Sequence, residues 1–114
     1  MNYFVLMMKM GEIVITGVER ITKVEEVSGC DSLSVSYPAL IGPIPNAPDK
    51  LGFSKYFPFS DSKDKMEIMV KNIVTVSKPN EGILKLYLGW IDGVRKAESN
   101  IITPDSGGRR IVTP

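Results

Sequence analysis

The sequence predicts a mainly β protein with one helix near its C-terminal end. The chain has 114 residues, which is enough for one domain with a single hydrophobic core. Up to Pro79, short runs rich in β-branched or aromatic residues alternate with Gly, Pro and polar turn residues, as antiparallel strands do. After Pro79 the apolar residues change to a helical period. About five or six strands are therefore expected; bent strands closing on themselves would form a small barrel.

Two strands are predicted at the start of the chain. Tyr3 to Lys9 is apolar and aromatic, and Met10-Gly11 makes a tight connection into the β-branched run from Glu12 to Val18. The alternation of this second run continues loosely as far as Val27. Gly17 lies inside it, which predicts a bulge or a sharp bend.

A third strand and a proline-rich loop follow the turn at residues 28–31. Ser32 to Tyr37 alternates polar and apolar residues, as a half-buried strand does. Pro38 should limit pairing to an edge or a strand end. The stretch from 39 to 52 is crowded with Pro and Gly and is predicted to be a loop, whereas Phe53 to Phe59 is aromatic and predicted to be extended.

Two further strands are predicted on either side of Lys71-Asn72, within KMEIMVKNIVTVSKP at residues 65–79. A two-residue hairpin turn usually has Asn-Gly or Asp-Gly, because both central residues need a positive φ. The cation and amide at this tip are therefore unusual. An irregular or longer turn is one explanation.

The predicted helix begins after Pro79, with Asn80 as N-cap and Glu81 in its first turn. Its apolar stripe contains Ile83, Leu84, Tyr87, Leu88 and Ile91. Gly93 is the expected end. The sequence thus divides into a domain at 1–94 and a polar, flexible tail at 95–114, which includes Arg109 and Arg110.

Several function classes are disfavoured by what the composition lacks. The chain has no His, the commonest general base and metal ligand, and its one Cys, Cys30, permits neither an internal disulfide nor a thiolate cluster. No metal, no cofactor and no enzymatic activity are expected. The 14 Lys and Arg nearly balance the 13 Asp and Glu, which disfavours binding of nucleic acid by bulk charge. The apolar opening run is too short to span a bilayer and has no basic leader, so a cytoplasmic location without membrane contact is expected.

Three stretches resemble the Sm/LSm-like family, and more closely a group of such proteins from marine cyanophages. They are Met8–Val14 with Gly17, Leu33–Pro38 followed by Phe57–Asp61, and Met69–Val74. The resemblance implies a small, strongly bent antiparallel five-stranded barrel of the SH3 type, assembled into a homo-oligomeric ring. It also implies binding of RNA around the central pore, with one loop pair from each subunit facing inward, inside the host cytoplasm if the protein is viral.

The resemblance places candidate nucleic-acid-binding residues in two loops. Lys71 and Asn72 stand where family members carry Arg-Gly, and Gly29 and Asp31 lie in the loop that usually carries an Asp and an Asn; here the Asn is missing. Lys can contact phosphate, and Asn a base edge or sugar. Plain surface turns are the alternative explanation of both loops, and it is the favoured one where no aromatic residue is present to stack on a base, as in the loop of Gly29 and Asp31.

Other candidates have simple structural explanations. Tyr56, Phe57 and Phe59 could stack on bases beside Lys55, but aromatic residues along a strand are more often core or interface. The acids Glu25 and Glu26 would point to opposite faces of a strand. Asp61 and Asp64 flank a polar turn, and Arg109 and Arg110 offer nonspecific phosphate contacts.

Two functions of different classes remain open at this point. One is a homo-oligomeric ring that binds single-stranded RNA or DNA. The other is a phage structural or assembly protein that self-associates without binding nucleic acid.

Overall fold

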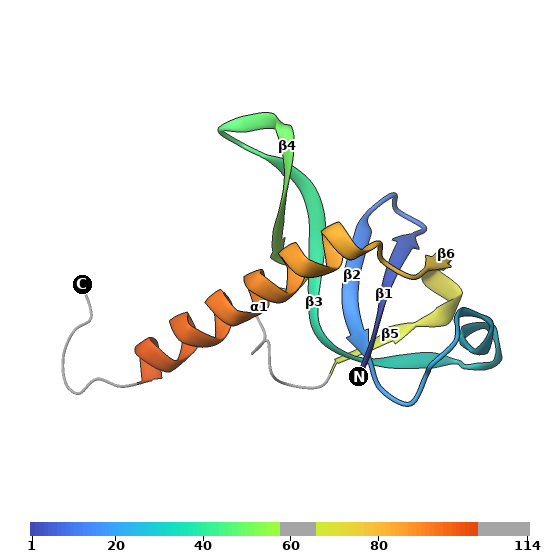
Figure 1. The fold of residues 1–114 in the computed structure, drawn as a ribbon. Coiled ribbons are helices and arrows are strands. Elements are labelled where there is room, and N and C mark those ends of the chain that lie inside the picture. Colours follow the sequence, from blue (N-terminus) through green and yellow to red (C-terminus); the bar gives the residue numbers. More distant parts are fainter. Residues whose placement is uncertain (58–65, 103–114) are drawn as a thin grey trace.

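The described part of the chain is mainly β, and its strands form one antiparallel sheet that is followed by a helix (Figure 1). The computed structural model describes residues 1–57 and 66–102. The elements in chain order are β1 (Asn2–Met8), β2 (Ile13–Val18), the 3-10 helix η1 (Val24–Gly29), β3 (Ser32–Ile44), β4 (Ala47–Lys55), β5 (Met66–Met69), the 3-10 turn η2 (Val70–Asn72), β6 (Ile73–Ser77) and α1 (Glu81–Ile102). The sheet order is β4-β3-β2-β1-β6, and β5 pairs with β3 outside this path. The predicted mainly β class with a C-terminal helix is confirmed.

The long strand β3 changes its partner halfway along its length. Ser32–Val35 pair with β5, and Ala39–Ile44 pair with β4. Between the two halves, Tyr37 has a left-handed φ of 50° and Pro38 follows it. The register with β2 shifts at this point, opposite Gly17. A bulge of this kind bends a strand, so the irregularity predicted at Gly17 is confirmed.

A hairpin of β3 and β4 occupies the stretch from 39 to 52, and the loop predicted there was wrong. The prolines that suggested a loop lie where a missing N–H costs little. Pro38 lies at the bulge, Pro43 lies beyond the end of β2, and Pro48 lies on β4 at the edge of the sheet. Of the predicted extended run Phe53–Phe59, the first three residues belong to β4 and the last two lie outside the described residues.

Apolar clusters hold both faces of the sheet. The inner face carries Phe4, Leu6, Met8, Val14, Val18, Val27, Leu33, Val35 and Ile68. On the outer face α1 crosses the sheet, and its Tyr87 and Ile91 pack against Ile15 and Ala39 (Figure 1). Residues 14–18 of β2 are all buried because this strand lies between the inner cluster and the helix.

The Tyr87 side chain joins the helix to the bulge in β3. Tyr87 is fully buried, and its hydroxyl donates a hydrogen bond to the Tyr37 carbonyl oxygen at 2.6 Å. Its ring meets Tyr3 edge-on and stacks on Trp90. Burial raises the pKa of the Tyr87 hydroxyl, so the fold favours the neutral form that can donate this bond.

The start of α1 follows the sequence prediction, but its end does not. The Asn80 side-chain oxygen accepts a hydrogen bond from the Ile83 N–H at 2.9 Å, as an N-cap does. The helix continues past Gly93 to Ile102, because a helical glycine costs only about 1 kcal/mol. Leu88 is 41% exposed and does not belong to the buried stripe.

The predicted tail begins inside this helix. Residues 95–102 continue α1, with an ion pair of 3.3 Å between Asp92 and Lys96 one turn apart. Residues 103–114 lie outside the described part of the chain, and Arg109 and Arg110 lie there with them.

Candidate nucleic-acid interface

The two loops that carry the candidate residues lie side by side. The Val70 N–H donates a hydrogen bond to the Asp31 carbonyl oxygen at 2.9 Å, just beyond the pair of Ser32 with Met69. This bond joins the end of the η1 loop to the start of η2. Lys71, Asn72, Gly29 and Asp31, which are far apart in the sequence, therefore come from two adjoining segments, and all four are exposed.

Lys71 and Asn72 belong to a 3-10 turn and not to the tip of a hairpin. β5 pairs with β3, and β6 pairs with β1, so the two strands that flank the turn have different partners. The Ile73 N–H closes the turn on the Val70 carbonyl. Among the described residues other than glycine, only Arg20 and Tyr37 have a positive φ. The turn thus needs no glycine, and the predicted hairpin was wrong.

A further lysine lies beside this turn, and the sequence interpretation did not include it. The Lys9 N–H donates a hydrogen bond to the Asn72 carbonyl oxygen at 2.9 Å. Lys9 precedes the predicted tight connection, in which Gly11 takes a φ of 93°. The start of the β1–β2 turn therefore brings a second exposed lysine to η2. The backbone hydrogen bond that does so joins residues far apart in the sequence, so local sequence patterns could not predict it.

The η1 loop is fixed by its own side chains. The Glu26 carboxylate accepts hydrogen bonds from the backbone N–H of Thr22 at 2.9 Å and of Lys23 at 3.0 Å. These two bonds hold the pKa of Glu26 below its usual value. The strand predicted to continue to Val27 was wrong, because the chain forms a 3-10 helix there. Glu26 stabilises this turn, in which Gly29 is the last residue of η1 and Asp31 lies just beyond it.

A small aliphatic hollow of about 220 Å³ lies between η1 and β6. Its lining residues are Val24, Val27, Ser28, Val70, Ile73, Val74 and Val76. The hollow borders both candidate segments, and it places apolar surface next to a lysine and an amide. The spacing of Val24 and Val27 by three residues was the sequence signal for a helical turn here.

The remaining candidates are distributed elsewhere. Tyr56 packs against the inner cluster, and Phe57 is 51% exposed. Burial, followed by the charge of Glu12, raises the pKa of Tyr56. Cys30 donates to the Glu26 carbonyl. Phe59, Asp61 and Asp64 lie outside the described residues.

Residues 1–57 and 66–102 lack two features that would indicate other kinds of function. This part of the chain holds no cluster of three or more His, Cys, Asp and Glu side chains with the arrangement of a metal site. It also has no helix of sufficient length and apolar character to cross a bilayer.

The fold and the site define an antiparallel β protein with a C-terminal helix and two adjoining exposed loops. Neither a protein-family model nor a curated protein matches the sequence.

Proposed function

We propose that this protein is an Sm-like nucleic-acid-binding protein that acts as a homo-oligomeric ring. The observation that carries the proposal is the hydrogen bond from Val70 to Asp31, because it joins the two loops that the resemblance assigns to binding. The strong bend of β3 and the order β3-β2-β1-β6 are also compatible with a barrel of the Sm-like, SH3-type class.

Each residue of the site has a specific role in this proposal. Lys71 contacts a phosphate of a single strand of RNA or DNA, and Lys9, whose backbone is hydrogen-bonded to Asn72, adds a second cation next to η2. Asn72 hydrogen-bonds a base edge or a sugar. Gly29 and Asp31 belong to the segment that adjoins the start of η2, through the hydrogen bond from Val70 to Asp31. A ring repeats these few contacts around one pore, so a net charge of +1 per chain is compatible with useful affinity.

Self-association is supported by the free edges of the sheet. The two end strands of the path, β4 and β6, have no partner on their outer sides within the described chain. Val74 on β6 is 61% exposed and Leu51 on β4 is 65% exposed. An open edge with apolar side chains favours pairing with another strand.

Binding of a labelled oligo(U) or a mixed single strand tests the proposal. Lys71→Ala should lose most of the salt-sensitive binding, whereas Lys50→Ala, which removes an exposed lysine from β4, should keep it. No binding at tens of micromolar protein would overturn the nucleic-acid role. A strict monomer by light scattering would overturn the ring.

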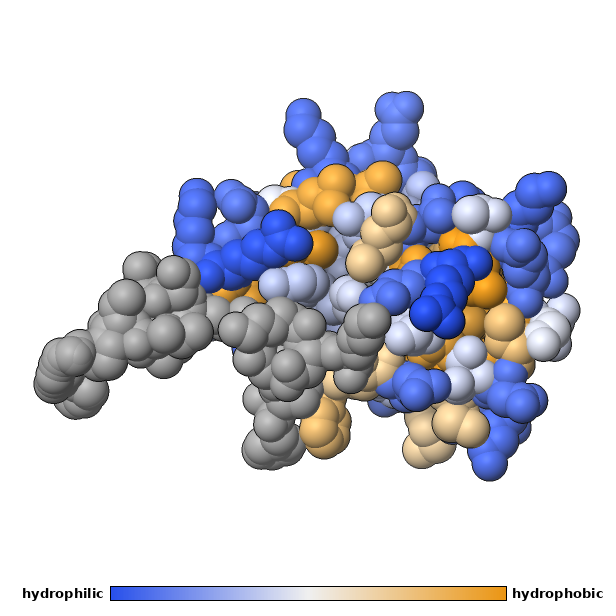
Figure 2. Space-filling view, turned by 90° about the horizontal axis from the view of Figure 1, so that it is seen from below, coloured by the Kyte–Doolittle hydropathy of each residue, from blue (hydrophilic) through white to orange (hydrophobic). Residues whose placement is uncertain are grey.

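A structural or assembly role is the second candidate, and it is supported by large apolar side chains that are exposed on α1 and on the edge strands. Figure 2 shows hydrophobic side chains interleaved with hydrophilic ones over the face it presents. Large exposed apolar side chains also occur on α1, where Leu86 is 64% exposed. Such a protein would assemble without nucleic acid, so an oligomer that binds no oligonucleotide would favour this role over the first.

A further inference from the structure

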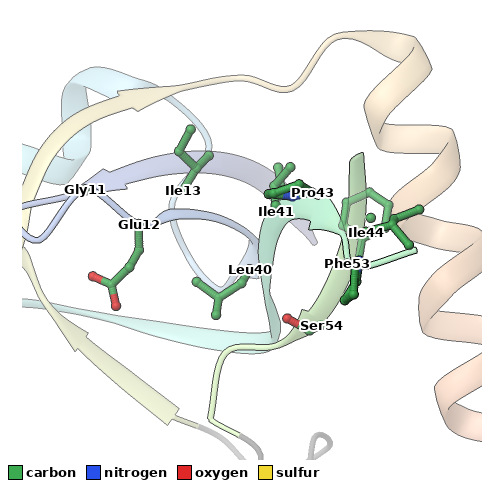
Figure 3. A pocket seen from close by; sticks show the side chains of 12 residues that line it. Gly11, Glu12, Ile13, Leu40, Ile41, Pro43, Ile44, Phe53 and Ser54 are labelled. Carbon is green, nitrogen blue, oxygen red and sulfur yellow. The ribbon is translucent and has the colours of Figure 1, made fainter. Parts of the chain in front are cut away.

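A larger hollow lies where the β3–β4 hairpin projects past the start of β2 (Figure 3). It has a volume of about 550 Å³ and is lined by the β1–β2 turn and by both strands of the hairpin. The last pair between β2 and β3 is Ile13 with Ile41, so within the described chain Gly42 to Ile44 have no partner on the β2 side. Lys71 and Asn72 do not line this hollow, which makes it a second, separate site.

A pair of glycines opens the floor of the hollow. Gly42 pairs with Gly52, and the neighbouring pair on the same face is Leu40 with Ser54. A Cβ added at Gly42 would meet no atom of the described residues within 4 Å, whereas one added at Gly52 would lie 2.8 Å from Ile44. The open floor is therefore at Gly42, with Leu40 and Ile44 as apolar walls. Strand glycines often mark a place where a ligand approaches the backbone closely.

One carboxylate lies at the rim of this floor. In Figure 3 the Glu12 side chain projects to the same side of the strands as Leu40, and Ile13 and Ile41 project to the other side. Glu12 is half-buried, and its carboxylate forms no hydrogen bond or ion pair within the described chain. Its charge contributes to the raised pKa of Tyr56, after burial, which shows that this charge acts near the hairpin. The carboxylate is available to N–H donors of a ligand.

We propose that this hollow binds a guanine base. Guanine presents a ring N–H and an amino group side by side on its Watson–Crick edge, and a carboxylate can accept from both. Adenine and cytosine present the amino group beside an acceptor nitrogen, and uracil presents one N–H between two carbonyl oxygens that the carboxylate repels. A flat purine fits over Gly42 between Leu40 and Ile44, and Ser54 offers a further hydroxyl.

Under the proposed function, the guanine belongs to a nucleotide of the bound strand. The inference rests on the proposed function to that extent. The charge of Glu12 repels phosphate, so the hollow recognises the base and leaves the backbone outside. Lys71 then supplies affinity at the other site, and Glu12 supplies base preference. One other class of ligand has the chemistry to bind in this hollow: a basic protein segment whose side chain would meet the same carboxylate.

Free mononucleotides test the inference independently of strand binding. Backbone NMR signals of Gly42 and Gly52 are followed while guanosine, inosine, adenosine and uridine monophosphates are added to the full chain. Guanosine monophosphate should shift both signals, and inosine monophosphate, which lacks the amino group, should bind about tenfold more weakly. Glu12→Gln should abolish the preference for guanine, and Asp49→Asn, which changes an exposed carboxylate of the same hairpin, should leave it unchanged.

A second variant fills the hollow without touching the carboxylate. Gly42→Val adds a side chain into open space on a strand, so the thermal midpoint of the variant should not fall, while the guanosine-induced shift of the Gly52 signal should disappear. Equal binding of all four nucleotides, binding that survives both variants, or no shift at about 10 mM nucleotide would overturn the inference. Shifts produced only by a basic pentapeptide would also overturn it. If guanosine binds but oligonucleotides do not, the proposed function fails and this site remains.

Discussion

Replacement of Tyr87 by phenylalanine tests the link between the helix and the bent strand. The substitution keeps the ring and its contacts with Tyr3 and Trp90, and it removes only the hydroxyl that donates to the Tyr37 carbonyl at 2.6 Å. A buried acceptor that loses its donor costs about 1–3 kcal/mol. Because Tyr87 is fully buried, we expect a loss of about 2 kcal/mol, which lowers the thermal midpoint by about 8 °C at about 4 °C per kcal/mol.

Urea unfolding, followed by circular dichroism and by Trp90 fluorescence, measures this loss. The midpoint concentration should fall with an unchanged slope, because the exposed area on unfolding is the same. Tyr3→Phe is the matched control, since the Tyr3 hydroxyl has no hydrogen bond within the described residues, and it should change stability by less than about 0.5 kcal/mol. A Tyr87→Phe protein within about 0.5 kcal/mol of the wild type would refute the reasoning.

Three further predictions concern the same fold. Because burial raises the pKa of Tyr87, its contribution is complete below about pH 10 and is lost as the pH rises further, so Tyr87→Phe should lose less stability than the wild type in alkaline unfolding curves. The pKa of Glu26 is lowered, so its contribution to stability is present above about pH 4.5 and is lost as the pH falls. Glu26→Gln should therefore reduce the loss of stability between neutral and acid pH. An unchanged loss would contradict the hydrogen bonds from the Thr22 and Lys23 N–H groups to the Glu26 carboxylate. Asn80→Ala should lower the free energy of unfolding in urea by about 1 kcal/mol, whereas Asn80→Asp should keep most of the wild-type stability, because a carboxylate oxygen can also accept the bond from the Ile83 N–H. Equal losses in the two variants would show that the side-chain oxygen is not the cap.

The parts of the fold that local patterns decide were predictable. Asn80 and the apolar period after it determine where α1 begins, because capping and amphipathicity act within a few residues. Gly17 marked the register shift between β2 and β3, because a glycine inside a strand is a local signal of such an irregularity. The first two strands followed from their composition in the same way.

The hairpin of β3 and β4 could not be predicted from the same kind of evidence. The cost of a proline in a strand depends on whether its missing N–H would face a partner, and that is a property of the sheet order. Pro48 is tolerated because β4 is an edge strand, and Pro43 because β2 has already ended. The pairing of Gly42 with Gly52 under the larger hollow depends on the register of this hairpin, so it could not be predicted either.

The residues of the candidate interface remain a prediction from the resemblance, and their arrangement could not be predicted from the sequence. The resemblance indicated Lys71 and Asn72, yet the hairpin expected there is a 3-10 turn whose flanking strands have different partners. Lys9 joins the site through a backbone hydrogen bond to Asn72, and only the folded chain brings the two together.

The salt dependence of oligonucleotide binding tests the central claim most directly. Each phosphate contact on a single strand contributes about 0.7 to the slope of log affinity against log salt concentration. The account predicts that Lys71→Ala lowers this slope by at least about 0.7 and weakens binding, while Lys50→Ala changes neither. Equal slopes for Lys71→Ala and the wild type would contradict it.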